Sequence, residues 1–339
     1  MVHVGVDLHK RFSQVAVLEE SGEIWQHRVE NDLAVVREFF EKLPRARVAI
    51  EATGSWWWLV DLLEELGHKP VLSHPKETKA IAHARLKNDR VDAERLADLC
   101  RGGLLPTVWI PPMSVREARE LIRHRVSLVW HRTRVKNGLT SLLARRNLRR
   151  SESRSWYTQE GVQEMRQLSL SPIPSRVRDD ALVLLRVLGH QIRRVEKQIL
   201  DTWGDDPIIR RLATIPGIGW FTSTALVLEL GQIRRFPSAK HLASYVGLTP
   251  RVKASGGRVR TGHISKEGNR ILRWLLVSAA TQATRRPGPL RNWYRRLQRR
   301  KGKKIARVAL ARRLTEIVYQ CWKERIDYWE FLCRQGVRG

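Results

Sequence analysis

Two short apolar runs near the amino terminus each carry a carboxylate to the end of a predicted strand, and this feature constrains the fold most. Asp7 follows Val4-Gly5-Val6, and Glu51 follows Val48-Ala49-Ile50. Apolar runs this short, ended by a polar break or a glycine turn, are typical of buried strands. We therefore expect two acidic side chains on, or at the tips of, central strands of one sheet.

Two further acidic residues, Asp89 and Asp92, are three residues apart in a stretch with helical character, so they share one helix face. Four carboxylates from two strands and one helix can converge on one point, where their repulsion is costly unless a cation neutralises it. Two Mg²⁺ ions about 4 Å apart, clamping the attacking and leaving oxygens of a phosphodiester, would supply that cation. We predict that Asp7, Glu51, Asp89 and Asp92 hold Mg²⁺ or Mn²⁺, because hard oxygen ligands suit these ions better than zinc.

The basic composition indicates a polyanionic partner. The 339 residues include 63 Lys and Arg against 34 Asp and Glu, a formal net charge of +29. A field of this sign and size favours nucleic acid, although charge alone predicts binding and no chemistry. The hydrophobic content of 42% and the 13 Trp indicate packed domains rather than a disordered basic tail.

Cysteine usage and hydropathy argue against several classes of protein. Cys100, Cys321 and Cys333 are an odd number without the spacing of zinc ligands, so neither a disulfide scaffold nor a structural zinc site is expected. No apolar run approaches the length of about 18 residues that a membrane span needs, and the first 30 residues lack a signal-peptide pattern. We expect a cytoplasmic protein with no membrane partner.

Residues 1–112 predict an α/β domain. Alternating runs at 3–7, 13–18 and 24–29 indicate three strands in hairpin order, and 48–50 and 71–73 indicate two more. Helices are expected near 32–43, 55–66, 76–85 and 91–100. This order predicts a mixed sheet with helices on both faces, the plan of a ribonuclease-H-like domain.

Residues 113–205 predict an antiparallel helical coiled-coil hairpin, because apolar residues recur every seven positions in two long segments. These residues are Leu121, Leu128, Val135 and Leu142 in the first segment and Ala181, Leu188 and Val195 in the second. Between Arg116 and Arg154 there are 12 Lys or Arg and three acidic residues. A solvated face and a surface for the phosphate backbone are both consistent with this charge.

Residues 206–339 predict a mainly α-helical domain. Ile215 to Gly219 is typical of the turn in a helix-hairpin-helix element, whose glycines let backbone N–H groups approach a phosphate; a plain interhelical turn is the alternative. Gly247 to Arg258 is expected to be a loop. From Arg285 to Lys304 there are ten Lys or Arg and no acidic residue. This run is expected to contact phosphates non-specifically, with a merely solvated run as the alternative.

Eleven basic residues in this last region are the candidate nucleic-acid ligands. They are Arg251, Lys253, Arg258, Arg260, Lys266, Arg270, Arg295, Arg296, Arg299, Arg300 and Lys301. In the amino-terminal part, Trp56-Trp57-Trp58 favours packing of a helix against the sheet, with base or sugar stacking as the alternative. His9 is a candidate to bond a phosphate, or a structural histidine with satisfied hydrogen bonds.

Together these motifs resemble the DEDD class of bacterial insertion-sequence transposases, the family that also contains pilin-type DNA invertases. Gly5-Val6-Asp7, Ile50 to Gly54 and Asn88 to Ala93 are similar to its RuvC-like domain. Ile215 to Gly219, Ala243 to Arg251 and Ile264 to Arg273 are similar to its transposase domain. The motifs are weak singly, but they occur in the expected order across nearly the whole chain.

The resemblance implies three parts: a RuvC-like catalytic domain at 1–112, a linker for dimerisation and nucleic-acid binding at 113–205, and a transposase domain at 206–339. It implies a bacterial, nucleoid-associated enzyme that moves an element between donor and target DNA. Some members are guided by a structured bridge RNA. In those members a serine attacks DNA and becomes linked to a 5′ phosphate, and the matching position here is Ser255.

The leading hypothesis is therefore a site-specific DNA recombinase that cuts and rejoins DNA at a composite site of the four carboxylates and Ser255. Serine needs activation by a base or a metal, so both domains must contribute, from one protomer or from two. Because two DNA ends must be held together, we expect a homodimer or homotetramer, joined through the helical hairpin.

Several alternatives remain open. The enzyme could be a metal-dependent, structure-specific nuclease resembling a Holliday-junction resolvase, in which water is the nucleophile. A non-catalytic nucleic-acid scaffold is a third hypothesis. The four acids could be ordinary surface or capping residues, with Asp92 stabilised by a helix dipole. Ser255 could make turn hydrogen bonds beside its two glycines.

Overall fold

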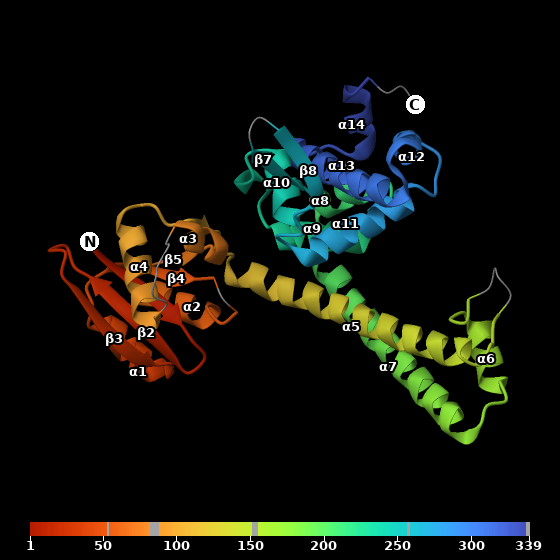
Figure 1. Cartoon of the computed structure of the whole chain (residues 1–339), viewed down its shortest axis with the longest axis horizontal. Helices are drawn as coiled ribbons and strands as arrows, with labels where there is room; N and C mark the ends of the chain where they lie inside the picture. The colour runs from red at the N-terminus through yellow and green to blue at the C-terminus, as the bar shows by residue number, and fades with distance from the viewer. Residues whose placement is uncertain (53, 82–87, 151–154, 256–257, 337–339) are drawn as a thin grey trace. The chain divides into compact units, whose positions relative to one another are not determined.

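The structure is a computed structural model that describes residues 1–52, 54–81, 88–150, 155–255 and 258–336. For residues 252–255 and 258–261 it describes the backbone alone. The chain divides into two compact units, Met1–Pro111 and Pro112–Gly339 (Figure 1). Each unit has a hydrophobic core of its own.

The first unit is a mixed sheet with helices. Its elements are β1 (Val2–Leu8), β2 (Phe12–Leu18), β3 (Ile24–Glu30), α1 (Leu33–Glu41), β4 (Ala46–Glu51), α2 (Trp57–Glu65), β5 (Lys69–Ser73), α3 (Pro75–Ile81), α4 (Asp89–Arg101) and β6 (Thr107–Val108). The strand order is β3-β2-β1-β4-β5-β6. Strands β1, β2 and β3 pair antiparallel, whereas β4 is parallel to both β1 and β5. The predicted mixed α/β organisation is confirmed.

Alternation of side chains along the central strands gives the sheet two different faces. Val4 and Val6 of β1 are fully buried in one core cluster with Phe40 of α1 and Leu63 of α2. Ala49 of β4 is buried on the other face, in a cluster with residues of α4. The sheet therefore lies between α1 and α2 on one side and α4 on the other.

Helix α4 approaches β1 most closely at Gly5. A Cβ atom at this position would lie 1.9 Å from the carbonyl oxygen of Ala93 and 2.6 Å from the backbone nitrogen of Ala97. Only glycine, which has no Cβ, allows the two backbones to come this close. The distance of α4 from the sheet, and with it the place of its first turn, therefore depends on Gly5.

The second unit is mainly helical, as predicted. Its elements are α5 (Met113–Ala144), α6 (Gln159–Gln167), α7 (Pro172–Trp203), α8 (Pro207–Ala213), α9 (Trp220–Leu230), η1 (Ile233–Arg235), α10 (Ala239–Val246), β7 (Pro250–Ser255), β8 (Arg258–Ile264), α11 (Arg270–Ala283), α12 (Pro289–Lys301), α13 (Lys303–Glu324) and α14 (Tyr328–Arg334). Helix α13 is the centre of its core, with Leu310 and Leu314 fully buried. No helix in the described part of the chain is long and apolar enough to cross a membrane.

The two long helices α5 and α7 run side by side away from the rest of the second unit, with α6 near their far end (Figure 1). At that end Leu143 of α5, Met165 of α6 and Leu182 of α7 are buried in a small cluster of their own. Along the pair, Arg125 of α5 forms an ion pair with Glu196 of α7. The pairing of α5 and α7 therefore combines apolar packing with a charged contact.

A buried carboxylate joins α5 to α9 and to the start of α11. Glu229 of α9 is fully buried and accepts hydrogen bonds from Arg123 Nε at 2.8 Å and Arg123 Nη2 at 3.0 Å. It also accepts one from Asn269 Nδ2 at 2.9 Å. The Asn269 side chain in turn caps α11 by accepting the backbone N–H groups of Ile271 and Leu272. The helical hairpin is thus tied to the helix that follows β8.

The expectation of a loop from Gly247 to Arg258 is wrong, because this region begins an antiparallel pair of strands, β7 and β8. Ser255 pairs with Arg258, which leaves a connection of two residues, Gly256-Gly257, outside the described residues. A Gly-Gly pair between two extended runs is a hairpin signal.

The turn between α8 and α9 has a packing role. Gly217 has a φ of +89°. A Cβ atom there would lie 2.2 Å from the carbonyl oxygen of Ala279 in α11. Both features require glycine for contact with α11. A helix-hairpin-helix function for this turn stays a prediction.

Candidate metal centre

The pairing of β1 with β4 places two of the predicted acids side by side. Val6 pairs with Ile50 in parallel register, so Asp7 and Glu51 are the next residues at the carboxyl ends of neighbouring strands. Asp7 is two residues beyond Gly5 and Glu51 two beyond Ala49, so each shares the sheet face of that residue. Because Gly5 and Ala49 face α4, both carboxylates lie on the α4 side of the sheet.

The other two acids lie in the first turn of α4. Asn88 caps this helix, and its side chain accepts a hydrogen bond from the backbone nitrogen of Arg90 at 3.3 Å. Negative charge in a first turn is stabilised by the helix dipole, which favours carboxylates at Asp89 and Asp92 even without a ligand. The close contact of α4 with Gly5 brings this turn to the end of β1.

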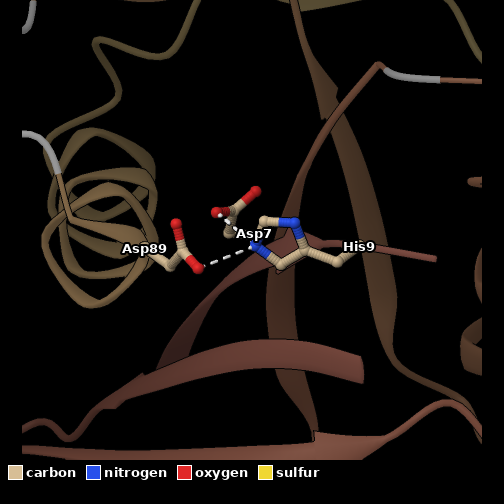
Figure 2. Close-up of side chains that lie close together, drawn as sticks. All are labelled: Asp7, His9 and Asp89. Atoms are coloured by element: carbon tan, nitrogen blue, oxygen red, sulfur yellow. Dashed lines mark ion pairs between the residues drawn. The ribbon is translucent and has the colours of Figure 1, made fainter. Parts of the chain in front are cut away.

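Two of the four acids meet around a histidine. The Nε2 atom of His9 lies 3.2 Å from Asp7 Oδ2 and 3.2 Å from Asp89 Oδ2. One possible ligand atom from each of the three residues lies within 4.8 Å of the others. Figure 2 shows the Asp7 and Asp89 carboxylates on the same side of the imidazole, with Asp89 coming from the helix. Two carboxylate oxygens and one imidazole nitrogen this close can bind one divalent cation.

The orientation of His9 is fixed by the loop that follows β1. The backbone nitrogen of His9 donates to the carbonyl oxygen of Phe12 at 3.0 Å. The Nδ2 atom of Asn31 donates to the carbonyl oxygen of His9 at 2.7 Å. The imidazole and the Phe12 ring are 4.7 Å apart, and the guanidinium of Arg28 lies 3.9 Å from the centre of the same Phe12 ring. The Nε2 atom is therefore held toward the two carboxylates.

The electrostatics of the site suit a cation. Burial raises the pKa of Asp7, the nearby His9 lowers it, and the charges of Asp89, Asp92 and Glu51 raise it further. All four predicted acids therefore interact in the folded first unit, and their combined effect disfavours the charged form of Asp7. A bound cation would remove this penalty, so the donor set fits a divalent metal ion.

The structure differs from the predicted set in one respect. Among the described residues, Glu51 and Asp92 lie outside the close group, although their charges act on Asp7, and His9 lies inside it. The sequence signal for His9 was its position two residues after Asp7, which left a phosphate contact and a structural role open. In the tertiary structure the Nε2 atom of His9 faces the carboxylates of Asp7 and Asp89.

The predicted residues of the second unit lie on and around the β7–β8 pair and on α12. Ser255 is the last residue of β7, but the side chains of Ser255, Lys253, Arg258 and Arg260 lie outside the described ones. Arg251 donates from Nη2 to the Ser265 carbonyl oxygen at 3.2 Å. Lys266 is exposed, and the guanidinium of Arg270 lies 5.1 Å from the Trp130 ring centre. The five basic residues predicted on α12 are all exposed: Arg295, Arg296, Arg299, Arg300 and Lys301.

Two family models match this chain. Residues 4–147 match the model of the DEDD transposase domain of the IS110 type, described as "Transposase". Residues 209–295 match the model described as "Transposase IS116/IS110/IS902 family". The first match contains Asp7, Glu51, Asp89 and Asp92, and the second contains Ser255.

Individual relatives match over most of their length. The chain is 29% identical to the "Probable family 20 transposase" of Pseudomonas aeruginosa, over 93% of this chain and 95% of that protein. It is 25% identical to the transposase for insertion sequence element IS1328 of Yersinia enterocolitica, over 93% of this chain and 95% of the relative. It is 30% identical to the pilin gene-inverting protein of Moraxella bovis, over 80% of this chain and 78% of that protein.

Proposed function

Because this chain belongs to the IS116/IS110/IS902 family of DEDD transposases, we propose that it cuts and rejoins DNA at a metal site formed by Asp7, Glu51, Asp89 and Asp92. The enzyme is a DNA transposase of an insertion sequence. The observation that carries the proposed site is the meeting of Asp7 and Asp89 at His9, with Glu51 and Asp92 close enough to raise the pKa of Asp7.

The residues of the first unit have distinct parts in this proposal. Asp7 and Asp89 would hold Mg²⁺ or Mn²⁺, and Glu51 and Asp92 would complete the negative charge around it. The ion would supply Lewis-acid polarisation of the scissile phosphate and neutralise charge on the attacking and leaving oxygens. His9 would add an imidazole nitrogen to this donor set, because its Nε2 lies 3.2 Å from an oxygen of each of these two carboxylates.

Ser255 is the proposed nucleophile. Its oxygen would form a bond to the scissile phosphorus as the bond from phosphorus to the 3′ oxygen breaks, which leaves a 3′ hydroxyl and a 5′ phosphate joined to the protein. The serine proton passes to a general base and the departing 3′ oxygen takes up a proton from a general acid, since serine is a weak nucleophile without activation. Support comes from the family motif and from the position of Ser255 at the end of β7, next to two glycines that allow close approach.

Basic residues of the second unit are the proposed contacts to donor and target DNA. Helix α12 presents Arg295, Arg296, Arg299, Arg300 and Lys301 to solvent, and it contains no acidic residue. Such a surface binds phosphates with little regard to sequence. The sequence specificity is proposed to come from a structured guide RNA, which purification of the protein from its host cells and sequencing of the bound RNA would test.

A dimer or tetramer is proposed because two DNA ends must be held together. The long helices α5 and α7 are the proposed contact between protomers. Helix α7 exposes Ile173, Val177, Leu184 and Val187, with exposed fractions of 78%, 50%, 46% and 48%. Their positions lie along one side of the helix, as an apolar seam between two helical hairpins would require.

The test of the nucleophile compares Ser255→Ala with Ser265→Ala. After incubation with DNA and Mg²⁺, a denaturing gel shows whether a DNA strand stays attached to protein. We expect Ser265→Ala to keep this adduct, and Ser255→Ala to lose it while still binding DNA. Loss in Ser265→Ala alone would move the nucleophile to that residue.

The same gel separates the recombinase from a nuclease that uses water. The four acidic residues with their metal ion are sufficient for a nuclease. Such an enzyme would cut DNA and leave every product free of protein. Asp7→Ala is expected to abolish cutting under either mechanism. Cutting that survives Asp7→Ala would rule out the proposed metal site.

A further inference from the structure

A pocket of about 420 Å³ lies at the carboxyl end of β1, on the α1 and α2 side of the sheet, and it shares His9 with the group formed by Asp7, His9 and Asp89. This volume lies in the range of about 300 to 1,000 Å³ that is usual for small-ligand sites. Its walls come from the end of β1, the start of α1 and the segment that enters α2, and include His9, Lys10, Asn31, Leu33, Ser55 and Trp58. The pocket therefore belongs to the first unit alone.

The apolar part of the pocket is suited to a flat ring. Trp58 is partly buried, packs against the core of the first unit and also lines the pocket. Leu33, at the start of α1, is 56% exposed and lines the same pocket. An anchored indole offers a stacking surface with little loss of side-chain freedom, since its position is already fixed.

The polar part supplies one cation and one hydroxyl group. Lys10 and Ser55 are both exposed at the pocket, and Lys10 makes no ion pair with any residue that the structure describes. Asn31 is already engaged, because it donates to the His9 carbonyl oxygen and accepts from Ser13 Oγ at 2.7 Å. Asn31 thus holds the pocket wall, and Lys10 and Ser55 remain to contact a ligand.

An aromatic surface, an ammonium group and a hydroxyl group together match the base, phosphate and sugar of one nucleotide. His9 connects this pocket to the carboxylates, since it lines the pocket and its Nε2 lies 3.2 Å from Asp7 and Asp89. A strand whose phosphate lies at the carboxylates must run past His9 or away from it. The first course crosses the end of β1 toward the α1 and α2 side of the sheet, where the pocket lies.

We propose that this pocket binds the nucleotide next to the scissile phosphate, with its base against Trp58 and a neighbouring phosphate at Lys10. The inference rests on the proposed function, because it assumes that DNA is cleaved at the metal site of Asp7, Glu51, Asp89 and Asp92. A base in the pocket is unstacked from its neighbours, and unstacking is least costly where the strand is already unpaired. The enzyme therefore engages a locally opened strand at its cleavage point.

The test pairs a change in DNA with a change in protein. The probe is a DNA duplex that contains the mapped cleavage point, with an abasic site at one or the other nucleotide beside the scissile phosphate. Binding by the full chain is measured in Ca²⁺ by fluorescence anisotropy. The protein variants are Trp58→Leu, which keeps apolar volume without the aromatic ring, and Trp329→Ala as a control at an exposed tryptophan of α14.

We expect the abasic site at one flanking position to weaken wild-type binding on the order of tenfold, the usual effect of one base stacked on an aromatic side chain. Trp58→Leu should weaken binding of intact DNA by the same factor, and should show no further loss with the abasic probe. Trp329→Ala should behave as wild type. The proposal is wrong if the affinity losses from the abasic site and from Trp58→Leu multiply when they are combined. It is also wrong if an abasic site at neither flanking position weakens binding.

A second pair of changes covers the case in which Trp58→Leu does not fold. Lys10→Gln alters an exposed side chain, and a neutral methylphosphonate in the DNA removes the charge that Lys10 is proposed to contact. The affinity losses from Lys10→Gln and from the methylphosphonate should again not multiply when they are combined. Independent losses would show that Lys10 does not contact that phosphate. A protein that binds and cuts DNA without either coupling overturns this inference alone, whereas a protein that neither binds nor cuts DNA overturns the proposed function as well.

Discussion

Gly5→Ala is expected to disrupt the metal site by displacing helix α4, without changing any candidate ligand. The new Cβ would lie 1.9 Å from the Ala93 carbonyl oxygen, and ordinary contact begins near 3.4 Å. Helix α4 must therefore move by about 1.5 Å, the difference between these two distances. Both neighbours are backbone atoms of a helix, so no side chain can rotate to relieve the contact.

The magnitude follows from this displacement. Forcing one extra carbon into a packed core costs about 1 to 3 kcal/mol of unfolding free energy. For a unit of this size, each kcal/mol lowers Tm by about 4 to 8 °C. Since α4 carries Asp89 and Asp92, a movement of this size also separates them from Asp7, and a 1 Å misplacement at a catalytic site costs about 100-fold in rate. We expect a lower Tm together with a larger loss of DNA cleavage.

The assay combines thermal unfolding with single-turnover cleavage. Gly138→Ala is the control, because a Cβ there has no atom within 4 Å and the position lies inside α5. Alanine favours helices over glycine by about 1 kcal/mol, so the control should keep or raise Tm. A Gly5→Ala protein with unchanged Tm and wild-type cleavage would refute the close contact between β1 and α4.

Three further predictions follow from the electrostatics. Because the pKa of Asp7 is raised in the folded state, mainly by burial, metal-free protein should lose stability as pH rises from the acid range through that pKa. Asp7→Asn should remove this loss and raise Tm near neutral pH. Mg²⁺ at 100 times its Kd should add about 2.7 kcal/mol to the unfolding free energy of the wild type and nothing to that of the variant, as thermal unfolding would measure. Arg123→Met should cost about 3 kcal/mol in denaturant unfolding, because among the described residues the fully buried Glu229 then keeps Arg119, at 3.9 Å, as its cationic partner. Arg134→Met at an exposed position should cost little. Replacing Arg295 and Arg299 by Ala should lower the slope of log K against log salt by about 2, and an unchanged slope would place DNA elsewhere.

Local sequence patterns were sufficient for the general plan of both units. Strand periodicity in residues 2–30 and the helical patterns that follow depend on each residue and its near neighbours, and the structure has β1, β2, β3 and α1 where these patterns predict them. The β7–β8 pair was predicted as a loop, although its Gly-Gly hairpin signal is local. The family match depends on motif order, which is also a property of the sequence.

The sequence by itself determined that carboxylates stand at strand ends and a helix start, that the chain is strongly basic, and that it belongs among DEDD transposases. Only the tertiary structure decided that His9 lies between Asp7 and Asp89, that Gly5 admits α4, and that Trp58 and Lys10 share a pocket with His9. The physical reason is that Asp7 and Asp89, Gly5 and Ala93, and His9 and Trp58 are about 50 to 90 positions apart in the chain. Their geometry is set by the packing of helices onto the sheet, and no periodicity within one segment records that packing.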